Sequence, residues 1–224
     1  LADVAGALPL ALAETGVEVT VFLPGFPGVL SGLSAKKTLA KLPKVAGHPA
    51  KLVTGKTGTG LNVIALDAPH LFDIEGNPYL DAFGNDRAGH GEKFAAFAKI
   101  GAELAMGKIG RKKYDVLHAH DWQAGLCAAY VKAANDTRVK TVLTIHNLAF
   151  QGLFPKSLMA NLDLPSGFYG RDGLEYWDQI SFLKAGVIYS DHITTVSPTY
   201  ALEIQSDDGG MGFGGLLHSK ADTL

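Results

Sequence analysis

Residues 115–147 read DVLHAHDWQAGLCAAYVKAANDTRVKTVLTIHN, and this stretch decides the fold. Short apolar runs predict strands over residues 115–118 and 140–145, and the residues between them predict a helix over 122–134. A strand, a helix and a strand joined by short connections favour parallel pairing of the two strands. We therefore expect an α/β fold built on a Rossmann-like, doubly wound parallel sheet.

The same alternation continues on both sides of this stretch. The pattern predicts helices over residues 2–15, 92–106, 180–189 and 198–204, and strands over 17–23, 61–66 and 192–196. The strand over 17–23 is nearly all apolar, which suits burial on both faces. Residues 31–60 stay undecided, with a possible short strand over 51–54, and residues 67–91 form a long irregular stretch of a kind that is usually functional or mobile. No linker interrupts the pattern, so one domain over residues 1–224 is the simplest interpretation.

The composition excludes several classes of protein. Twenty basic and 22 acidic residues leave a formal charge of −2, so no basic excess points to nucleic acid or to an anionic membrane. A hydrophobic share of 47% excludes disorder as the main state. The single cysteine, Cys127, excludes both a disulfide framework within the chain and a multi-cysteine zinc site. No apolar run reaches the ~18 residues of a membrane span and no signal peptide is present, so we expect a cytoplasmic protein.

The two ends of the sequence suggest a piece of a longer protein. Residue 1 is Leu rather than Met, and a helical pattern starts there without a polar cap. The far end, Asp222-Thr223-Leu224, stops without a recognisable tail. We therefore expect the chain to be a fragment at both ends.

Polar side chains gather where the predicted parallel strands end. His118, His120 and Asp121 close one strand, and His146 and Asn147 close the next. Ligands of open parallel sheets bind beyond the carboxyl ends of the strands, so this edge is the candidate site.

Each of these residues also has a structural interpretation. One histidine of His118-Ala119-His120 could be a satisfied core residue, and Asp121 could be the N-cap of the following helix without losing ligand contact. For His146 a core role is weaker, because its neighbours Ile145 and Leu148 offer no polar partner. A metal site is disfavoured, because no carboxylate-rich set with metal-ligand spacing accompanies the histidines.

Several nucleotide-binding and hydrolase motifs are absent. No G-x-G-x-x-G follows a predicted strand, and the glycine-rich segment 209–215 follows a helical pattern instead. No Walker A sequence and no G-x-S-x-G elbow occur. These absences argue against a dehydrogenase, a P-loop NTPase and an α/β-hydrolase.

Five motifs in the same order resemble those of glycogen and starch synthases, with the bacterial glycogen synthases the closer match. They are LADVAGALP at residues 1–9, HAHDWQ at 118–123, TIHNLAFQG at 144–152, SFLKAG at 181–186 and TVSPTYA at 195–201. The resemblance implies the N-terminal, acceptor-side half of a GT-B glycosyltransferase. It implies ADP-glucose as the donor, an α-1,4-glucan (glycogen) as the acceptor, retention of the anomeric configuration, and neither a metal nor another cofactor. The family's first strand and glycine loop would precede residue 1, and its nucleotide-binding C-terminal domain would follow residue 224 as a partner within the same parent protein.

The resemblance also implies roles for individual residues. His146 and Asp121 are expected to be catalytic, and Asp3, Tyr79, Asn147 and His120 are expected to bind substrate. His146 matches the histidine that contacts the donor glucose near the reacting carbon. The sequence departs from the family at residues 88–93, AGHGEK, where Asp-Asn and then Arg-Phe are usual and only the following Phe94 is kept. The surroundings of Gly209 also depart from the usual pattern.

Two other functions stay open at this point. The departure at residues 88–93 favours a non-catalytic glucan-binding module with the same fold. Another GT-B enzyme, such as a sugar-nucleotide epimerase, is a further alternative, although the HAHDW and TIHN motifs argue against it. None of these alternatives involves nucleic acid or a membrane.

Overall fold

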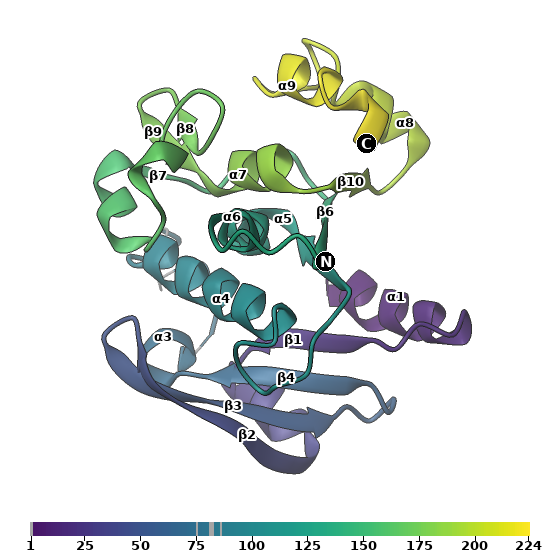
Figure 1. Ribbon diagram of the computed structural model, residues 1–224, viewed down its shortest axis with the longest axis vertical. Coiled ribbons are helices and arrows are strands. Elements are labelled where there is room, and N and C mark those ends of the chain that lie inside the picture. The colour runs from purple at the N-terminus through teal and green to yellow at the C-terminus, as the bar shows by residue number, and fades with distance from the viewer. Residues whose placement is uncertain (1, 75, 81–82, 86) are drawn as a thin grey trace. The chain divides into compact units, whose positions relative to one another are not determined.

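The computed structural model describes residues 2–74, 76–80, 83–85 and 87–224 (Figure 1). The chain forms two compact units, Leu1–Lys93 and Phe94–Leu224, and each is described by itself. Helix α4 (His90–Ala105) begins in the first unit and continues into the second. No helix among the described residues is both long and apolar enough to cross a membrane.

The first unit is built on a four-stranded mixed sheet in the order β1-β4-β3-β2. Strands β1 and β4 are parallel, whereas β3 runs antiparallel to both β4 and β2. Its core contains Leu33, Val63 and Ala65, which pack with half-buried aliphatic side chains of β1 and α2. The elements in chain order are α1 (Ala2–Glu14), β1 (Thr20–Pro24), α2 (Pro27–Gly32), β2 (Ser34–Val45), β3 (His48–Lys56), β4 (Asn62–Asp67) and α3 (Pro69–Phe72).

Two expectations for this unit need correction. Strand β1 is half-buried along its length rather than buried on both faces, because among the described strands it pairs only with β4. The undecided region contains a long hairpin, β2–β3, instead of one short strand. Its turn places Ala46 and Gly47 at φ 46° and 90°, which matches the handedness of a tight hairpin. Alanine is an uncommon residue at such a position, so the turn signal is weak in the sequence.

The second unit is built on a three-stranded parallel sheet in the order β10-β6-β5, which confirms the predicted α/β class. Leu143, Ile145 and Ile193 form its buried face, and helices α6 and α7 pack together closely. The elements are β5 (Val116–His120), α5 (Asp121–Ala124), α6 (Leu126–Ala133), β6 (Lys140–Ile145), β7 (Leu153–Pro155), η1 (Lys156–Asn161), η2 (Ser166–Phe168), β8 (Glu175–Tyr176), β9 (Gln179–Ser181), α7 (Phe182–Tyr189), β10 (His192–Thr195), α8 (Pro198–Glu203), α9 (Gly214–His218) and η3 (Ala221–Thr223).

Helix boundaries differ from the prediction at two places. The helix predicted over 122–134 is divided at Gly125 into α5 and α6, and a side chain on Gly125 would lie 2.2 Å from the carbonyl oxygen of Phe182. The helix predicted from residue 180 begins at Phe182, because the Ser181 hydroxyl caps it by accepting a hydrogen bond from the Lys184 N–H at 3.1 Å.

Candidate functional site

Three strands of the second unit place a row of polar side chains on one face of the sheet. His118 and His120 alternate with the buried Ala119 along β5, so both lie on the face opposite to it. His120 is in register with Thr144 of β6, which is in register with Thr194 of β10. The row therefore crosses the sheet near the carboxyl ends of its strands.

Hydrogen bonds and ring stacking connect this row to His146. His118 Nε2 lies 2.6 Å from Thr144 Oγ1, which lies 2.6 Å from Thr194 Oγ1. The rings of His118 and His120 stack with centroids 4.4 Å apart. His120 Nδ1 lies 3.0 Å from His146 Nε2, so one of these nitrogens donates and the other accepts. The argument against a core role for His146 considers only its neighbours Ile145 and Leu148, and the structure provides a partner from the neighbouring strand instead.

Burial favours the neutral forms of His118 and His120. Burial, followed by the proximity of His118 and His146, lowers the pKa of His120 to about 4. Burial, followed by the proximity of His146, also lowers the pKa of His118. A neutral histidine can donate a hydrogen bond from one ring nitrogen and accept one at the other, which suits recognition of sugar hydroxyls.

Asp121 does not cap the helix that follows it, which corrects the predicted N-cap role. Helix α5 begins at Asp121 itself, and no side chain caps it. The Asp121 carboxylate instead accepts a 2.7 Å hydrogen bond from the His146 backbone N–H. The residue has φ 54°, in the left-handed region that Asp tolerates better than most residues. Burial raises the pKa of Asp121, and the hydrogen bond from His146 opposes that rise. Asp121 therefore fixes the backbone that carries His146.

Further hydrogen bonds hold the loop after β6. The Tyr200 hydroxyl accepts from the Leu148 N–H at 3.0 Å, and Thr195 Oγ1 donates to the Ile145 carbonyl at 2.7 Å. Asn147 is exposed, and its Oδ1 accepts from the Ala149 N–H at 2.9 Å. The loop then passes over the indole of Trp122 at Gly152, where a Cβ would lie 2.7 Å from that ring. His146 and Asn147 are therefore presented on a rigid support.

Within the described ranges, no group of three or more His, Cys, Asp or Glu side chains is arranged to hold a metal ion.

The other two predicted site residues belong to the first unit. Asp3 is exposed in the first turn of α1, and Tyr79 is 36% exposed in the loop after α3. The structure therefore brings His120, Asp121, His146 and Asn147 together within the second unit, whereas Asp3 and Tyr79 belong to the first unit.

Arg87 and Lys93 hold the Tyr79 loop through its carbonyl groups. Arg87 Nε donates to the carbonyls of Asn77 and Leu80 at 3.0 and 2.8 Å, and its backbone N–H donates to the Tyr79 carbonyl at 2.9 Å. Lys93 Nζ donates to the Pro78 carbonyl at 3.1 Å. All four carbonyls of residues 77–80 are thus bound by these two residues. Lys93 is only 4% exposed, and burial followed by the charge of Arg87 lowers its pKa to about 8. The departure from the family at residue 93 therefore keeps a cationic donor.

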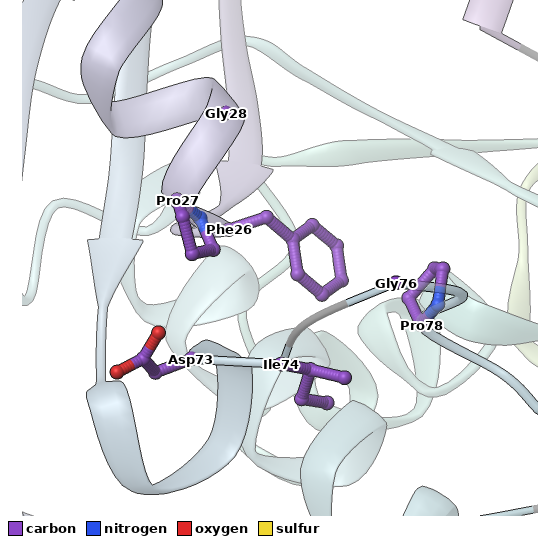
Figure 2. Close-up of a pocket in the computed structure, with 7 residues that line it drawn as sticks. All are labelled: Phe26, Pro27, Gly28, Asp73, Ile74, Gly76 and Pro78. Carbon is purple, nitrogen blue, oxygen red and sulfur yellow. The ribbon is translucent and has the colours of Figure 1, made fainter. Parts of the chain in front are cut away.

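A pocket of the first unit lies beside this loop. Phe26, Ile74 and Pro78 supply apolar walls and Asp73 supplies a carboxylate, and Pro27, Gly28 and Gly76 complete the lining. Figure 2 shows the Phe26 ring directed toward the segment that carries Pro78. Sequence reasoning missed Phe26, although it follows the carboxyl end of β1 and the strand-end rule could have indicated it.

The protein-family model for the starch synthase catalytic domain matches residues 1–219 of the chain. The chain belongs to the starch synthase catalytic domain family. Among curated relatives of this family member, a glycogen synthase of Rhodopseudomonas palustris (strain ATCC BAA-98 / CGA009) is 50% identical over 224 residues. Glycogen synthase 2 of Bradyrhizobium diazoefficiens is 48% identical. Each match covers 100% of this chain and 46% of the relative, so the chain spans about half the length of these proteins.

A solved starch synthase has the same fold. The catalytic domain of starch synthase IV from Arabidopsis thaliana, bound to ADP and acarbose, superposes with a TM-score of 0.82 at 24% identity. The superposition covers 99% of this chain and 46% of that one. The expected resemblance to the starch synthase catalytic domain family and the GT-B type of α/β architecture are confirmed.

Proposed function

We propose that the full-length protein is a retaining glucosyltransferase that extends an α-1,4-glucan from ADP-glucose. The observation that carries the proposal is the rigid His120–His146–Asp121 arrangement at the strand ends of a chain that the family model matches over residues 1–219. The relatives named glycogen synthase support the reaction, and the Arabidopsis structure bound to ADP and acarbose supports a nucleotide and a glucan as ligands.

In this proposal residues 1–224 form the acceptor-side domain, and a C-terminal domain of the same parent protein binds the nucleotide. His146 donates or accepts a hydrogen bond at the donor glucose, close to the reacting carbon. Such a bond accelerates transfer to the extent that it is stronger in the transition state than in the bound substrate. Asn147 offers its exposed carboxamide at the same loop. The leaving ADP would be neutralised by cationic residues of the C-terminal domain, as the family resemblance implies.

The roles of His120 and Asp121 are refined by their contacts. The Nδ1 atom of His120 is engaged by His146 and the Asp121 carboxylate is engaged by the His146 backbone, so both position His146.

Tyr79 and Asp3 remain proposed substrate-binding residues. The pocket lined by Phe26 and Asp73 combines apolar walls with one carboxylate, which suits a glucose unit of the acceptor. A cytoplasmic location also remains a proposal; the free, buried Cys127 fits a reducing compartment.

A non-catalytic glucan-binding module is the second candidate, and the AGHGEK departure is the feature that favours it. The retained donor at Lys93 weakens that argument.

The deciding experiment incubates the full-length protein with glycogen and ADP-glucose labelled in the sugar. We expect incorporation of label that β-amylase releases, because that enzyme cleaves α-1,4 linkages from chain ends. UDP-glucose serves as the matched donor control. Binding of glycogen without any incorporation would leave only the second candidate.

A further inference from the structure

An exposed tryptophan occupies an unfavourable backbone conformation at the tip of the β8–β9 hairpin. Trp177 is 82% exposed, and Trp177 and Asp178 have φ 51° and 59°. Tyr176 pairs with Gln179, so Trp177 and Asp178 form the whole turn. Tight hairpin turns of this kind favour Asn and Gly, and a bulky residue at positive φ is an outlier. Backbone strain of this type is often kept for a functional reason.

The base of the hairpin is held firmly. Tyr176 packs edge-on against Phe213, with ring centroids 4.7 Å apart, and the Asp178 N–H donates to Glu175 Oε1 at 2.9 Å. Lys184 Nζ donates to the Glu175 carbonyl, and it also donates to the Arg171 carbonyl at 2.7 Å. The indole is therefore presented by a rigid support without being buried. Figure 1 shows the hairpin at the border of the second unit, beyond α7 from β6 and β10.

Polar groups of both signs lie beside the tip. The Asp178 side chain is 90% exposed and lies 3.8 Å from Lys156 Nζ, and the Tyr169 hydroxyl donates to the Asp178 carboxylate at 3.4 Å. Lys156 Nζ also lies over the Tyr169 ring, 4.6 Å from its centroid. One carboxylate, one ammonium and one hydroxyl give this surface little net charge and many hydrogen-bonding groups.

We propose that Trp177, with Asp178, Lys156 and Tyr169, forms a surface binding site for an α-glucan, separate from the strand-end site. The C–H face of a pyranose packs on an aromatic ring, while its hydroxyls bond to polar groups at the ring's edge. The proposal rests on the proposed function, because that function makes a long glucan the acceptor. A second contact with the same polymer raises the effective concentration of its chain ends at the catalytic site.

The test uses the full-length protein and the substitution Trp177→Gly. Glycine relieves the positive φ of this turn position, so the unfolding midpoint should stay unchanged or rise. We expect about tenfold weaker co-sedimentation with glycogen and a matching rise in KM for glycogen. Transfer from ADP-glucose to maltotetraose, a short acceptor that supplies no polymer for a second contact, should keep its KM and kcat. Trp177→Tyr should restore most glycogen binding.

Leu202→Ala is the matched control, because Leu202 is 73% exposed on α8 and should leave glycogen binding unchanged. Unchanged glycogen binding by Trp177→Gly would overturn the inference. An equal loss of transfer to glycogen and to maltotetraose would overturn it as well, since it would assign Trp177 to the catalytic site or to a contact with the rest of the protein. Co-sedimentation requires no transfer, so a wild-type protein that binds glycogen but transfers no glucose would contradict the proposed function alone.

Discussion

His120 Nδ1 and His146 Nε2 lie 3.0 Å apart, although 26 residues separate them in the sequence. This contact orients the His146 ring, whose Nδ1 makes no hydrogen bond to the described residues and so can face a ligand. His118 stacks on the His120 ring, with centroids 4.4 Å apart, and restrains that ring further. The two histidines of β5 thus fix the orientation of His146 in the loop after β6.

His120→Ala should reduce kcat of the full-length protein by about 10- to 100-fold with little change in KM for glycogen, because a mispositioned His146 weakens transition-state contacts. His120→Asn places a carboxamide atom near the position of Nδ1 and should recover most of kcat. Steady-state kinetics of the two variants checks this. A rise in KM without a fall in kcat would contradict the positioning role. A kcat of His120→Asn as low as that of His120→Ala would contradict it as well.

Asp121→Ala should lower the unfolding free energy by about 1–3 kcal/mol, because the His146 N–H would lose its acceptor in a half-buried site. Asp121→Asn keeps an acceptor oxygen and tolerates the positive φ of this position, so its stability should stay close to that of the wild type. Denaturant titrations of both variants measure this. Equal destabilisation by Ala and Asn would show that the negative charge, and not the acceptor, matters.

Stability should depend on pH through His120. Its folded-state pKa of about 4 lies below the ordinary value of 6.5, so the unfolded chain binds more protons between these values. The contribution of His120 is therefore fully present above pH 6.5 and declines by up to ~3 kcal/mol as the pH falls toward 4.

His120→Asn removes this titration. The wild type should lose stability relative to the variant between pH 6.5 and 4, as measured by denaturant unfolding at several pH values. The raised pKa of Asp121 acts in the opposite direction in both proteins and cancels in the difference. A difference that stays constant over this range would contradict a neutral, buried His120.

Lys93→Met should raise KM for the glucan about 3- to 10-fold, because the Pro78 carbonyl loses its donor and the Tyr79 loop loosens. Lys93→Arg restores a cationic donor and should keep KM near that of the wild type. Lys99→Met, which removes a half-buried lysine of the same helix that pairs with Asp163, is the control and should leave the KM for glucan unchanged. If Lys93→Met leaves the KM for glucan unchanged, the Tyr79 loop does not contribute to acceptor binding.

The parts of the fold that depend on local pattern could be predicted. Strand β6 has the predicted bounds, and the strand-end rule placed His120, Asp121 and His146 at one edge. The contacts among these residues could not be predicted, because the register between β5 and β6 decides them. That register places His120 beside His146. It also brings the Asp121 carboxylate to the His146 N–H, so the carboxylate does not cap α5.

The β2–β3 hairpin was missed because most of β2 is exposed and its turn contains Ala46 instead of Asn. The departure at residues 88–93 looked damaging in the sequence. Only the structure shows that Lys93 reaches the Pro78 carbonyl from the first turn of α4. In both cases the missing information is a long-range contact.

The most direct test of the account is the turnover of His146→Ala in the full-length protein, with ADP-glucose as donor and glycogen as acceptor. Loss of a hydrogen bond that strengthens in the transition state costs roughly 3–4 kcal/mol, so we expect kcat to fall by about 10²–10³ while glycogen co-sedimentation and the unfolding midpoint stay near the wild-type values. Turnover close to that of the wild type, or a loss explained by unfolding, would contradict the assignment of His146 to the reacting sugar.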